Sequence, residues 1–377
     1  MKRISLFLLL FLLLKATVMY SQDGHPETNF RIVPVSPNAA SLGTYGLIPT
    51  DNYVGQARIS IPIYEIDLDG KKFPIALSYH TDGTRVAQEA TWIGLGWTLQ
   101  AGGCVVRQVQ GTDDFAARGC YNLTDAPWLT NPRFEVTDQN LEKYMGYFKG
   151  DYDAEPDMFY FNAGGHSGSM YFDVLKNNRQ LNAVPTIQTQ EKVVKMVYNT
   201  SNKTWTMTDL EGYVYSFSTK EITYYFLNTI DFFQTDITRS HIFPYYNEPQ
   251  IVTAWMLDSV TSPNGGKITF SYKKESIFTP ISTTEDVISL SKIVNGQLSS
   301  QSPQYFTNKF NYNYSYSKIE QWTLSAITFE GGKVEFGTTD REDIESAETG
   351  KKVQKLSSIK VSDTAGNLIK TTMLEYK

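Results

Sequence analysis

The segment Gly165–Ser169 is the one place where the sequence approaches a hydrolase motif. Its order, Gly-His-Ser-Gly-Ser, puts His166 beside Ser167 at the centre of a pattern similar to a nucleophile elbow. An elbow needs glycine at its fifth position, where Ser169 stands, and a helix after the turn. The residues that follow, Met170–Phe172, have the pattern of a strand. The sequence therefore predicts a hairpin turn of small residues, and we expect the chain not to be an enzyme.

A run of alternating carboxylates is the second group that could do chemistry. It consists of Asp151, Asp153, Glu155 and Asp157. Oxygen ligands at this spacing can gather around a hard cation such as Ca²⁺. An EF-hand loop would place glycine at its sixth position and glutamate at its twelfth, where this chain has Pro156 and Asn162. Two hypotheses stay open, a calcium site and a solvated acidic loop. No other cofactor is expected.

Cys104 and Cys120 are the only cysteines of the chain. If the chain is exported to an oxidising compartment, they can form one intramolecular disulfide. That bond would close a loop of about 16 residues and contribute ~3 kcal/mol of stability. Two buried thiols are the equal alternative. The four histidines are scattered, and with two cysteines they make no zinc-ribbon pattern.

The composition indicates which elements position these residues. Aromatic residues make up 14% of the 377 residues and charged residues only 20%. Aromatic side chains favour strands, and this composition disfavours both disorder and a coiled coil. The formal charge of −6 argues against a general nucleic-acid binder, which needs a basic face. The aromatic rings could also stack on sugars, although core packing is the role we expect for most of the tryptophans.

Alternation of apolar and polar residues dominates the chain, and amphipathic-helix spacing is rare. Isoleucine occupies every second position over 59–63, and a shift of the pattern at Tyr64–Glu65 indicates a β-bulge. Asp69–Gly70 supplies the geometry of a tight hairpin turn. Pro62 and Pro74 lack an N–H, so we expect each to lie in a strand that is an edge or is paired on one side only.

The rest of the chain reads as further hairpins. Strand-like runs flank turns near residues 164–169, 199–203 and 263–267, and a strand, a glycine turn and a return strand recur three times after residue 256. Residues 275–310 are rich in Ser, Thr and Gln and lack a period, which predicts a long loop. The only helix expected with some support lies around 139–148.

The first 21 residues have the pattern of a secretory signal. Lys2 and Arg3 precede the apolar run Ile4–Leu14, and Lys15 ends that run too early for a membrane-spanning helix. Cleavage after Ser21 would leave a more acidic chain. We therefore expect an exported protein, secreted or on the outer surface of a bacterium, with no transmembrane span after cleavage.

Two parts of the segment from Pro37 to Arg107 carry a family resemblance. The first is Pro37–Gly43, followed by the strand residues Ile59–Tyr64 and Pro74–His80. The second is Trp92–Trp97, of the Gly-Leu-Gly-Trp type, and it closes on Ala101–Gly103 and Arg107. This pattern resembles the N-terminal region of secreted bacterial RHS/YD-repeat proteins. Later segments fit as well, so the resemblance spans most of the chain after the signal.

The resemblance implies an architectural role. In that family glycines turn the strands, aromatic residues fill the sheets, and YD repeats build a shell around a C-terminal toxic effector. This chain departs from the family, since it has a lone Tyr152–Asp153, no run of YD repeats and no effector region. The resemblance therefore implies a structural module and carries over no toxin activity. The partners that it implies are the remainder of a longer RHS-type polypeptide or components of the cell envelope.

The sequence as a whole predicts an all-β protein with few helices. After the signal peptide, 1–21, we expect a β-sandwich-like domain over 22–175 and an array of antiparallel hairpins over 176–377. The last strand reads as unfinished, which suggests truncation at the C-terminus. The leading hypothesis is a non-enzymatic structural module of a secreted or cell-surface protein. The alternative is a carbohydrate- or cell-surface-binding β module that uses exposed aromatic residues.

Overall fold

The structure, a computed structural model, describes only part of the chain. The described residues are 33–45, 58–80, 88–111, 113–116, 119–122, 141, 153, 155–173, 184–188, 194–231, 250–289, 293–294, 297–298 and 308–376. The expected signal peptide and most of the helix expected near residues 139–148 lie outside them. The chain divides into two compact units, Met1–Ile32 with Gln110–Glu155, and Val33–Val109 with Pro156–Lys377. Everything below concerns the second unit unless stated.

The described residues are almost entirely antiparallel β-structure, as the sequence predicts. Two helical segments are present, α2 (Pro37–Tyr45) and η1 (Cys120–Asn122), the latter in the first unit. The strands are β1 (Arg58–Leu68), β2 (Lys71–His80), β3 (Trp97–Gln100), β4 (Gly103–Gln108), β5 (Met158–Ala163), β6 (His166–Tyr171), β7 (Thr186–Ile187), β8 (Val194–Asn199), β9 (Thr204–Asp209), β10 (Val214–Asp231), β11 (Gln250–Thr261), β12 (Lys267–Phe278), β13 (Ser282–Ser289), β14 (Ile293–Val294), β15 (Gln297–Leu298), β16 (Asn308–Phe329), β17 (Gly332–Asp340), β18 (Gln354–Ser362) and β19 (Leu368–Met373). None of the described helices is long and apolar enough to span a membrane.

A small sheet in the order β1-β2-β3 contains the first predicted hairpin. Asp69 and Gly70 form its turn with φ of 50° and 93°, as the pair of residue types predicts. The register shifts between Pro62 and Tyr64, which confirms the bulge. Pro62 lies in the edge strand β1. Pro74 pairs only with β1, because β3 pairs with β2 no further than Ala76.

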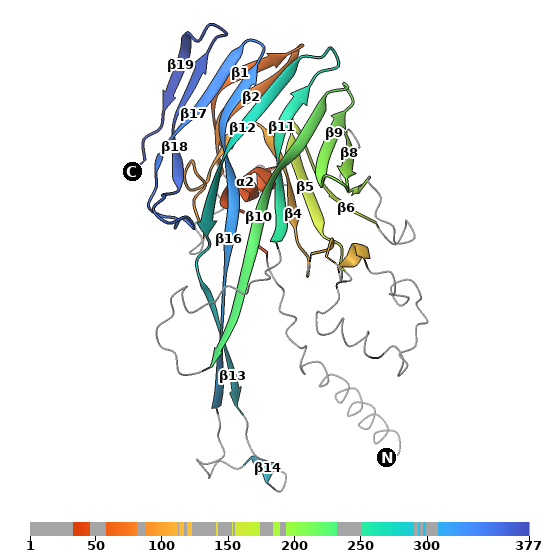
Figure 1. The fold of residues 1–377 in the computed structure, drawn as a ribbon, viewed down its shortest axis with the longest axis vertical. Helices are drawn as coiled ribbons and strands as arrows, with labels where there is room; N and C mark the ends of the chain where they lie inside the picture. Colours follow the sequence, from red (N-terminus) through yellow and green to blue (C-terminus); the bar gives the residue numbers. More distant parts are fainter. Residues whose placement is uncertain are drawn as a thin grey trace, which may run out of the picture. The chain divides into compact units, whose positions relative to one another are not determined.

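A 14-stranded sheet holds most of the remaining strands, and Figure 1 shows its long strands side by side. Its main path runs β19-β18-β17-β16-β10-β11-β4-β5-β6-β7. Strand β16 pairs with β10 and β13 in its first half and with β12 and β17 further on. Because β12 also pairs with β11, the strands β10, β11, β12 and β16 form a closed cycle of pairings.

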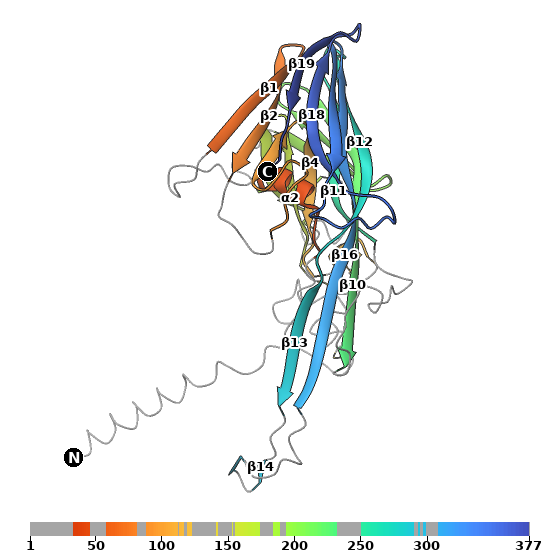
Figure 2. The ribbon, with the colours of Figure 1, turned by 90° about the vertical axis from the view of Figure 1, so that its left-hand side faces the viewer.

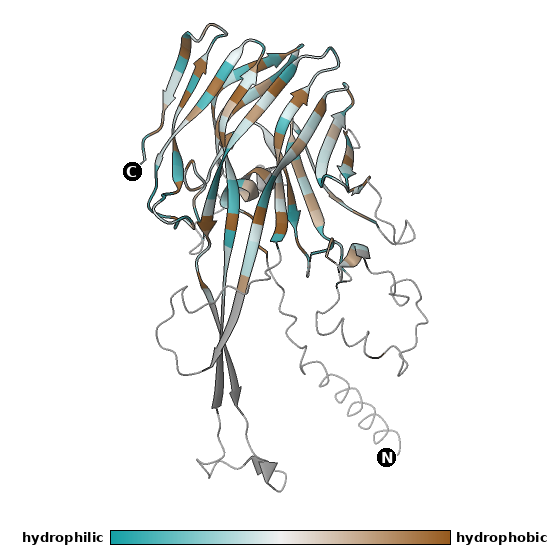
Figure 3. Cartoon of the chain, viewed as in Figure 1, coloured by the Kyte–Doolittle hydropathy of each residue, from teal (hydrophilic) through white to brown (hydrophobic). Residues whose placement is uncertain are grey.

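The core lies between the small sheet and the large one. Figure 2 shows β1 and β2 standing apart from the large sheet, with α2 near the gap between them. Aromatic rings bridge the sheets, since Phe73 of β2 lies 6.4 Å from Tyr215 of β10 and Tyr64 of β1 lies 6.1 Å from Phe329 of β16. Hydrophobic and hydrophilic residues alternate along many strands in Figure 3, which is the pattern of sheets with one buried face.

Two expectations differ from the structure. The long loop expected over 275–310 is wrong in part, because β12 continues to Phe278, β13 covers Ser282–Ser289 and β16 begins at Asn308. We expect a domain boundary after residue 175, but the structure has one continuous sheet across it. Strand β4, which precedes residue 175, pairs with β11, which follows it. The local pattern of hairpins gives no sign of this pairing, which joins residues about 150 positions apart.

Candidate functional site

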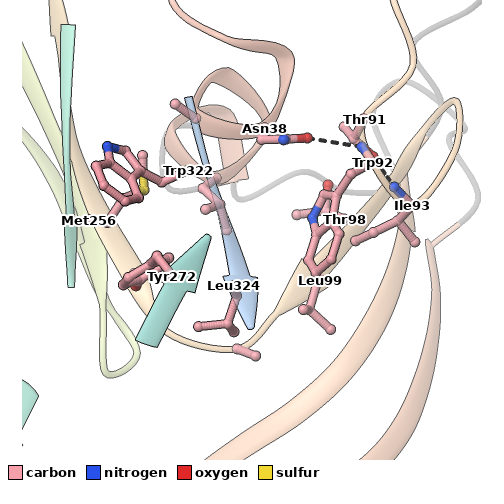
Figure 4. Close-up of a pocket in the computed structure, with 14 residues that line it drawn as sticks. Asn38, Thr91, Trp92, Ile93, Thr98, Leu99, Met256, Tyr272, Trp322 and Leu324 are labelled. Carbon is pink, nitrogen blue, oxygen red and sulfur yellow. Dashed lines mark hydrogen bonds between the residues drawn. The ribbon is translucent and has the colours of Figure 1, made fainter. Parts of the chain in front are cut away.

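The segments that carry the family resemblance meet at α2. Ser36 caps this helix: its Oγ accepts the N–H of Ala39 at 3.1 Å, and Pro37 occupies the first helical position. Asn38 then links two other segments. Its Oδ1 accepts the Trp92 N–H at 2.9 Å, as drawn in Figure 4, and its Nδ2 donates to Gln321 Oε1 of β16 at 3.3 Å. The helix therefore holds the segment after β2 against the large sheet.

The Gly-Leu-Gly-Trp segment is a compact turn. Gly94 and Gly96 adopt φ of 128° and 77°, which L side chains rarely adopt. Thr91 Oγ1 lies 3.0 Å from the Gly94 carbonyl oxygen and 2.8 Å from that of Trp97. Trp92 is buried and packs 6.4 Å from Phe336 of β17. The most specific part of the resemblance is thus fixed by backbone geometry and packing.

The space at this junction is small. A cavity of about 40 Å³ lies among α2, the Thr91–Leu99 segment and the large sheet. Figure 4 shows Met256, Tyr272, Trp322 and Leu324 on its side toward the large sheet. A volume of this size holds a few water molecules. The junction is therefore a packing centre, and it lacks room for a substrate.

A buried carboxylate anchors the start of α2. Glu221 of β10 is fully buried, and its Oε1 accepts the Ser36 N–H at 2.8 Å and the Thr253 hydroxyl at 3.1 Å. Burial raises the pKa of Glu221, although these hydrogen bonds oppose that rise. The sequence gives no local signal for this contact, because Ser36 and Glu221 lie 185 positions apart.

A second buried pair joins β4 to the segment before β5. Arg107 Nε donates to Asp157 Oδ2 at 2.8 Å, and Arg107 Nη2 lies against the same oxygen. The two side chains are only 1% and 0% exposed. The guanidinium carbon also lies 5.9 Å from the centre of the Phe159 ring. Asp157, predicted as a member of an acidic group, is here the counter-charge of Arg107.

A cluster of charged and phenolic groups links the small sheet to the large one. Lys71 of β2 lies 2.5 Å from Asp209 and 2.9 Å from Glu211, measured between Nζ and carboxylate oxygens. Tyr215 donates to Asp209 Oδ2 at 3.1 Å, and His166 Nε2 lies 3.7 Å from the same oxygen. His166 stands out in the sequence only as part of the motif Gly165–Ser169. Nothing in the sequence marks Lys71 and Asp209 as partners, because they lie 138 positions apart.

The charges in this cluster are fixed by its ion pairs. Burial lowers the pKa of Lys71, but hydrogen bonds to Asp209 and Glu211 outweigh it and raise the pKa above its ordinary value. Burial acts to raise the pKa of Asp209, but hydrogen bonds from Lys71 and from the Tyr213 N–H outweigh it, so this pKa is lowered. Burial and the nearby Lys71 lower the pKa of His166. The cluster therefore holds a protonated lysine, an ionised aspartate and a neutral imidazole at neutral pH.

Ser167 does not lie on a strand-to-helix elbow. It is the second residue of β6, which forms a hairpin with β5 through the turn at Gly164–Gly165. The side chain of Ser167 is exposed, whereas His166 is half-buried beside Asp209. The predicted hairpin of small residues is confirmed.

The acidic run divides between the two units and is described only in part. Asp151 lies outside the described residues. In the first unit Asp153 is buried and its Oδ1 accepts the N–H of the exposed Glu155 at 3.0 Å. Within the described part of the chain, no three His, Cys, Asp or Glu side chains gather as metal ligands would. The calcium site stays a prediction that depends on Asp151.

Both cysteines are free, buried thiols, which is the second of the two alternatives predicted for them. Cys104 belongs to the second unit, where it packs with Ala39, Val106 and Met256. Burial and the nearby Glu221 carboxyl raise the pKa of its thiol far above the ordinary value. Cys120 belongs to the first unit.

The aromatic residues fill the core. Trp205 and Trp255 are each 1% exposed and lie 6.1 Å apart, edge to face, in a cluster with Phe159, Phe172 and Tyr198. Every Trp, Tyr and Phe side chain whose burial is described is buried or half-buried. A platform of exposed rings, which the carbohydrate-binding alternative needs, is therefore not found in the described part of the chain.

Two edge strands carry several of the exposed apolar residues. Leu368, Ile369 and Met373 of β19 are 63%, 56% and 68% exposed. Ile59 and Ile61 of β1, the edge of the small sheet, are 48% and 45% exposed. The two edges are linked, because Lys370 Nζ of β19 donates to the carbonyl oxygen of Ile63 in β1 at 2.8 Å.

Comparison with known proteins gives only remote likenesses. No protein-family model matches the chain, and no curated protein matches it. A chain of the Photorhabdus luminescens Tc holotoxin pore is similar with a TM-score of 0.35 and 11% identity, over 87% of this chain and 14% of that one. The N-terminal domain of effector protein SpvB from Salmonella typhimurium strain LT2 gives 0.33 and 10%, over 86% and 100%. A crystal structure of TcdB2-TccC3-TEV gives 0.30 and 11%, over 91% and 14%.

The lengths of these proteins differ from that of the present chain. The chain spans 14% of each of the two Tc chains that it matches and the whole of the SpvB domain. All three names belong to bacterial toxin or effector proteins. At these TM-scores the likenesses carry no conclusion about this chain, and the proposal below depends on its own geometry.

Proposed function

We propose that the chain is a non-enzymatic, structural N-terminal module of a secreted or cell-surface protein of the RHS/YD-repeat type. Its two sheets would form one rigid body, and an edge of the large sheet would receive a further β-strand from the remainder of the longer polypeptide. The main support for this proposal is that β19 is exposed on both faces and pairs with a strand on one side only.

Strand β19 differs from its neighbours in being exposed on both faces. Five of its six residues are exposed, whereas β17 and β18 each bury several side chains. It pairs with β18 alone, so its other edge presents unpaired backbone groups. An edge strand with unpaired N–H and C=O groups and exposed apolar side chains is a template for strand addition.

The register of β19 identifies the backbone groups that face outward. Leu374 donates its N–H to the Ser357 carbonyl oxygen at 2.9 Å, so Leu374 bonds toward β18. In an antiparallel pair the direction of bonding alternates from one residue to the next. Thr372 and Lys370 therefore also bond toward β18, and Thr371 and Met373 present their N–H and C=O groups to an incoming strand; the alternation ends at Lys370, because the register shifts at Ile369.

The charged side chains that could take part in a reaction have structural partners, which supports a non-enzymatic role. Arg107 pairs with Asp157, Lys71 with Asp209, and Glu221 with the start of α2. Each contact joins segments far apart in the sequence. The Lys71 and Glu221 contacts hold the small sheet and α2 against the large sheet, and the Arg107 pair joins two segments within the large sheet.

The first test is genetic. The gene is read beyond the codon for Lys377, and the proposal expects an RHS/YD-repeat region in the same frame or after a frameshift. That segment is then produced separately and its binding to the full chain is measured by co-purification and by hydrogen exchange of residues 368–373. Binding should slow the exchange of the outward amides of Thr371 and Met373.

One substitution tests the edge itself. Thr371→Pro removes an outward N–H while it leaves the bonds toward β18, and proline is tolerated at such edge positions. We expect this variant to fold and to lose binding of the downstream segment. Thr371→Val keeps the N–H and the shape of the side chain, so it should bind as the unchanged chain does. A stop codon in intact sequence after Lys377, or full binding by Thr371→Pro, would contradict the proposal.

A further inference from the structure

A second, larger pocket lies between the two sheets. Its volume is about 180 Å³, and apolar side chains from both sheets form its walls. Ile75 of β2 contributes one side, and Leu257 of β11, Ile268 of β12 and Ile327 of β16 contribute the other. These four side chains are 2% exposed or less. The pocket is therefore a partly open space between the two sheets, and these buried side chains form its deepest walls.

The pocket follows from the short third strand of the small sheet. Strand β3 pairs with β2 only as far as Ala76, and Pro74 has no N–H with which to continue that pairing. The turn Gly164–Gly165 lines the same space. Pro74 and Gly165 are the exposed lining residues, so they mark the entrance.

Two glycines of the lining, Gly103 and Gly164, have no room for a side chain. A Cβ on Gly103 would lie 2.4 Å from the Asn162 carbonyl oxygen, and one on Gly164 would lie 2.3 Å from the Tyr215 hydroxyl. Both contacts are shorter than any that a real Cβ makes. These two glycines therefore allow the close packing of β4 on β5, and of the β5–β6 turn on β10, beside the pocket.

The chemistry of the walls selects an uncharged occupant. The described residues that line the pocket include no charged side chain, and its polar groups are Thr98, Gln100 and Asn162. Asn162 already donates from Nδ2 to the Leu42 carbonyl oxygen at 3.0 Å. A charged ligand would lose its hydration without gaining a counter-charge. An apolar cavity of about 150 Å³ can hold one benzene molecule, so this larger volume of about 180 Å³ suits one small aromatic molecule.

We propose that this pocket binds one neutral, mostly apolar small aromatic molecule, of the size of indole and with one hydrogen-bonding group. The ring lies among Ile75, Leu257, Ile268 and Ile327, and its polar group lies toward Thr98, Gln100 and Asn162. This site is separate from the β19 edge and does not depend on the function proposed above.

Indole is the probe for this site, and benzoate is the charged comparison of similar size. The purified full chain is titrated with each, and binding is followed by the thermal midpoint and by chemical-shift changes of the isoleucine methyl groups. Indole should raise the midpoint in a saturable manner and shift the methyl signals of Ile75, Ile268 and Ile327. Benzoate should do neither. Failure of indole to saturate, or an equal effect of benzoate, would overturn the proposal.

A filling variant tests the location. Ile327→Phe places a larger side chain in the pocket and should weaken indole binding on the order of tenfold or more, the scale of a small steric misfit in an apolar pocket. Ile359→Phe makes the same change at a fully buried residue of β18 that does not line the pocket. If that variant fails to fold, Ile359→Val replaces it. Either control should bind indole normally, and unchanged binding by Ile327→Phe would overturn the proposal.

Discussion

The buried pair Arg107–Asp157 allows a sharp test of what stabilises the sheet between β4 and β5. The side chains are 1% and 0% exposed, so neither charge is screened by solvent. Asp157→Asn keeps the shape of the side chain but removes its charge, and the guanidinium then stays buried without this counter-charge. Breaking a buried ion pair from one side destabilises a protein by about 3–5 kcal/mol. We expect a loss of this size in the free energy of unfolding.

The measurement is urea unfolding at neutral pH, followed by tryptophan fluorescence. Arg107→Met with Asp157→Leu removes both charges together, and we expect this double variant to lie within about 1–2 kcal/mol of the unchanged chain, because well-packed apolar residues can replace a buried pair. Glu342→Gln is the control, since it breaks an ion pair between two exposed side chains, Lys352 and Glu342. Its unfolding midpoint should not change.

Two results would refute this reasoning. If Asp157→Asn lowers the free energy of unfolding by less than about 1 kcal/mol, the pair is not the buried, unscreened contact described here. Arg107→Met and Asp157→Leu are also measured singly; if the loss in the double variant equals the sum of these two single losses, the two residues do not act on each other.

Three further predictions concern other contacts. The thiols of Cys104 and Cys120 should not react with a thiol reagent in the native chain and should both react in urea, because both are buried and burial also raises the pKa of Cys104; fast labelling of Cys104 in the native state would contradict this. Because the folded-state pKa of Asp209 is lowered, its stabilisation is present above the unfolded pKa of ~3.9 and is lost as pH falls through the folded value. Lys71→Met should therefore flatten the fall of stability with acid, and an unchanged acid-unfolding curve would count against the ion pair. Gly70→Ala should lower the free energy of unfolding by about 1 kcal/mol or more, because alanine is strained at a φ of 93° although its Cβ meets no atom; equal stability in urea would show that the turn relaxes.

The hairpins could be predicted from the sequence because their signals are local. Asp69–Gly70 and the Gly-rich turn before His166 fix adjacent strands, and alternation shows which residues face inward. The helix α2 was missed because it spans only Pro37–Tyr45, although Ser36 followed by Pro37 is a helix-start signal that could have been used.

The arrangement of the hairpins could not be predicted in the same way. The pairing of β4 with β11 depends on contacts between residues about 150 positions apart, and single-sequence periodicity carries no information at that range. The same holds for the candidate site: Lys71 and Asp209 look like ordinary strand-end charges until β2 and β9 are brought together. The exposed apolar side chains of β19 were also unexpected, since Leu368 and Met373 read as core residues of a strand.

The bonds of α2 also determine when this protein can finish folding. Ser36 needs Glu221, and Asn38 needs Gln321, which are 185 and 283 positions later in the chain. Contacts of such long range form slowly, because a long loop must close before they stabilise anything. The N-terminus leaves the ribosome first. The segment 33–45 therefore lacks these hydrogen-bond partners until most of the protein has been made. Nascent chains arrested before residue 321 should leave this segment open to proteases, and chains released beyond β16 should protect it.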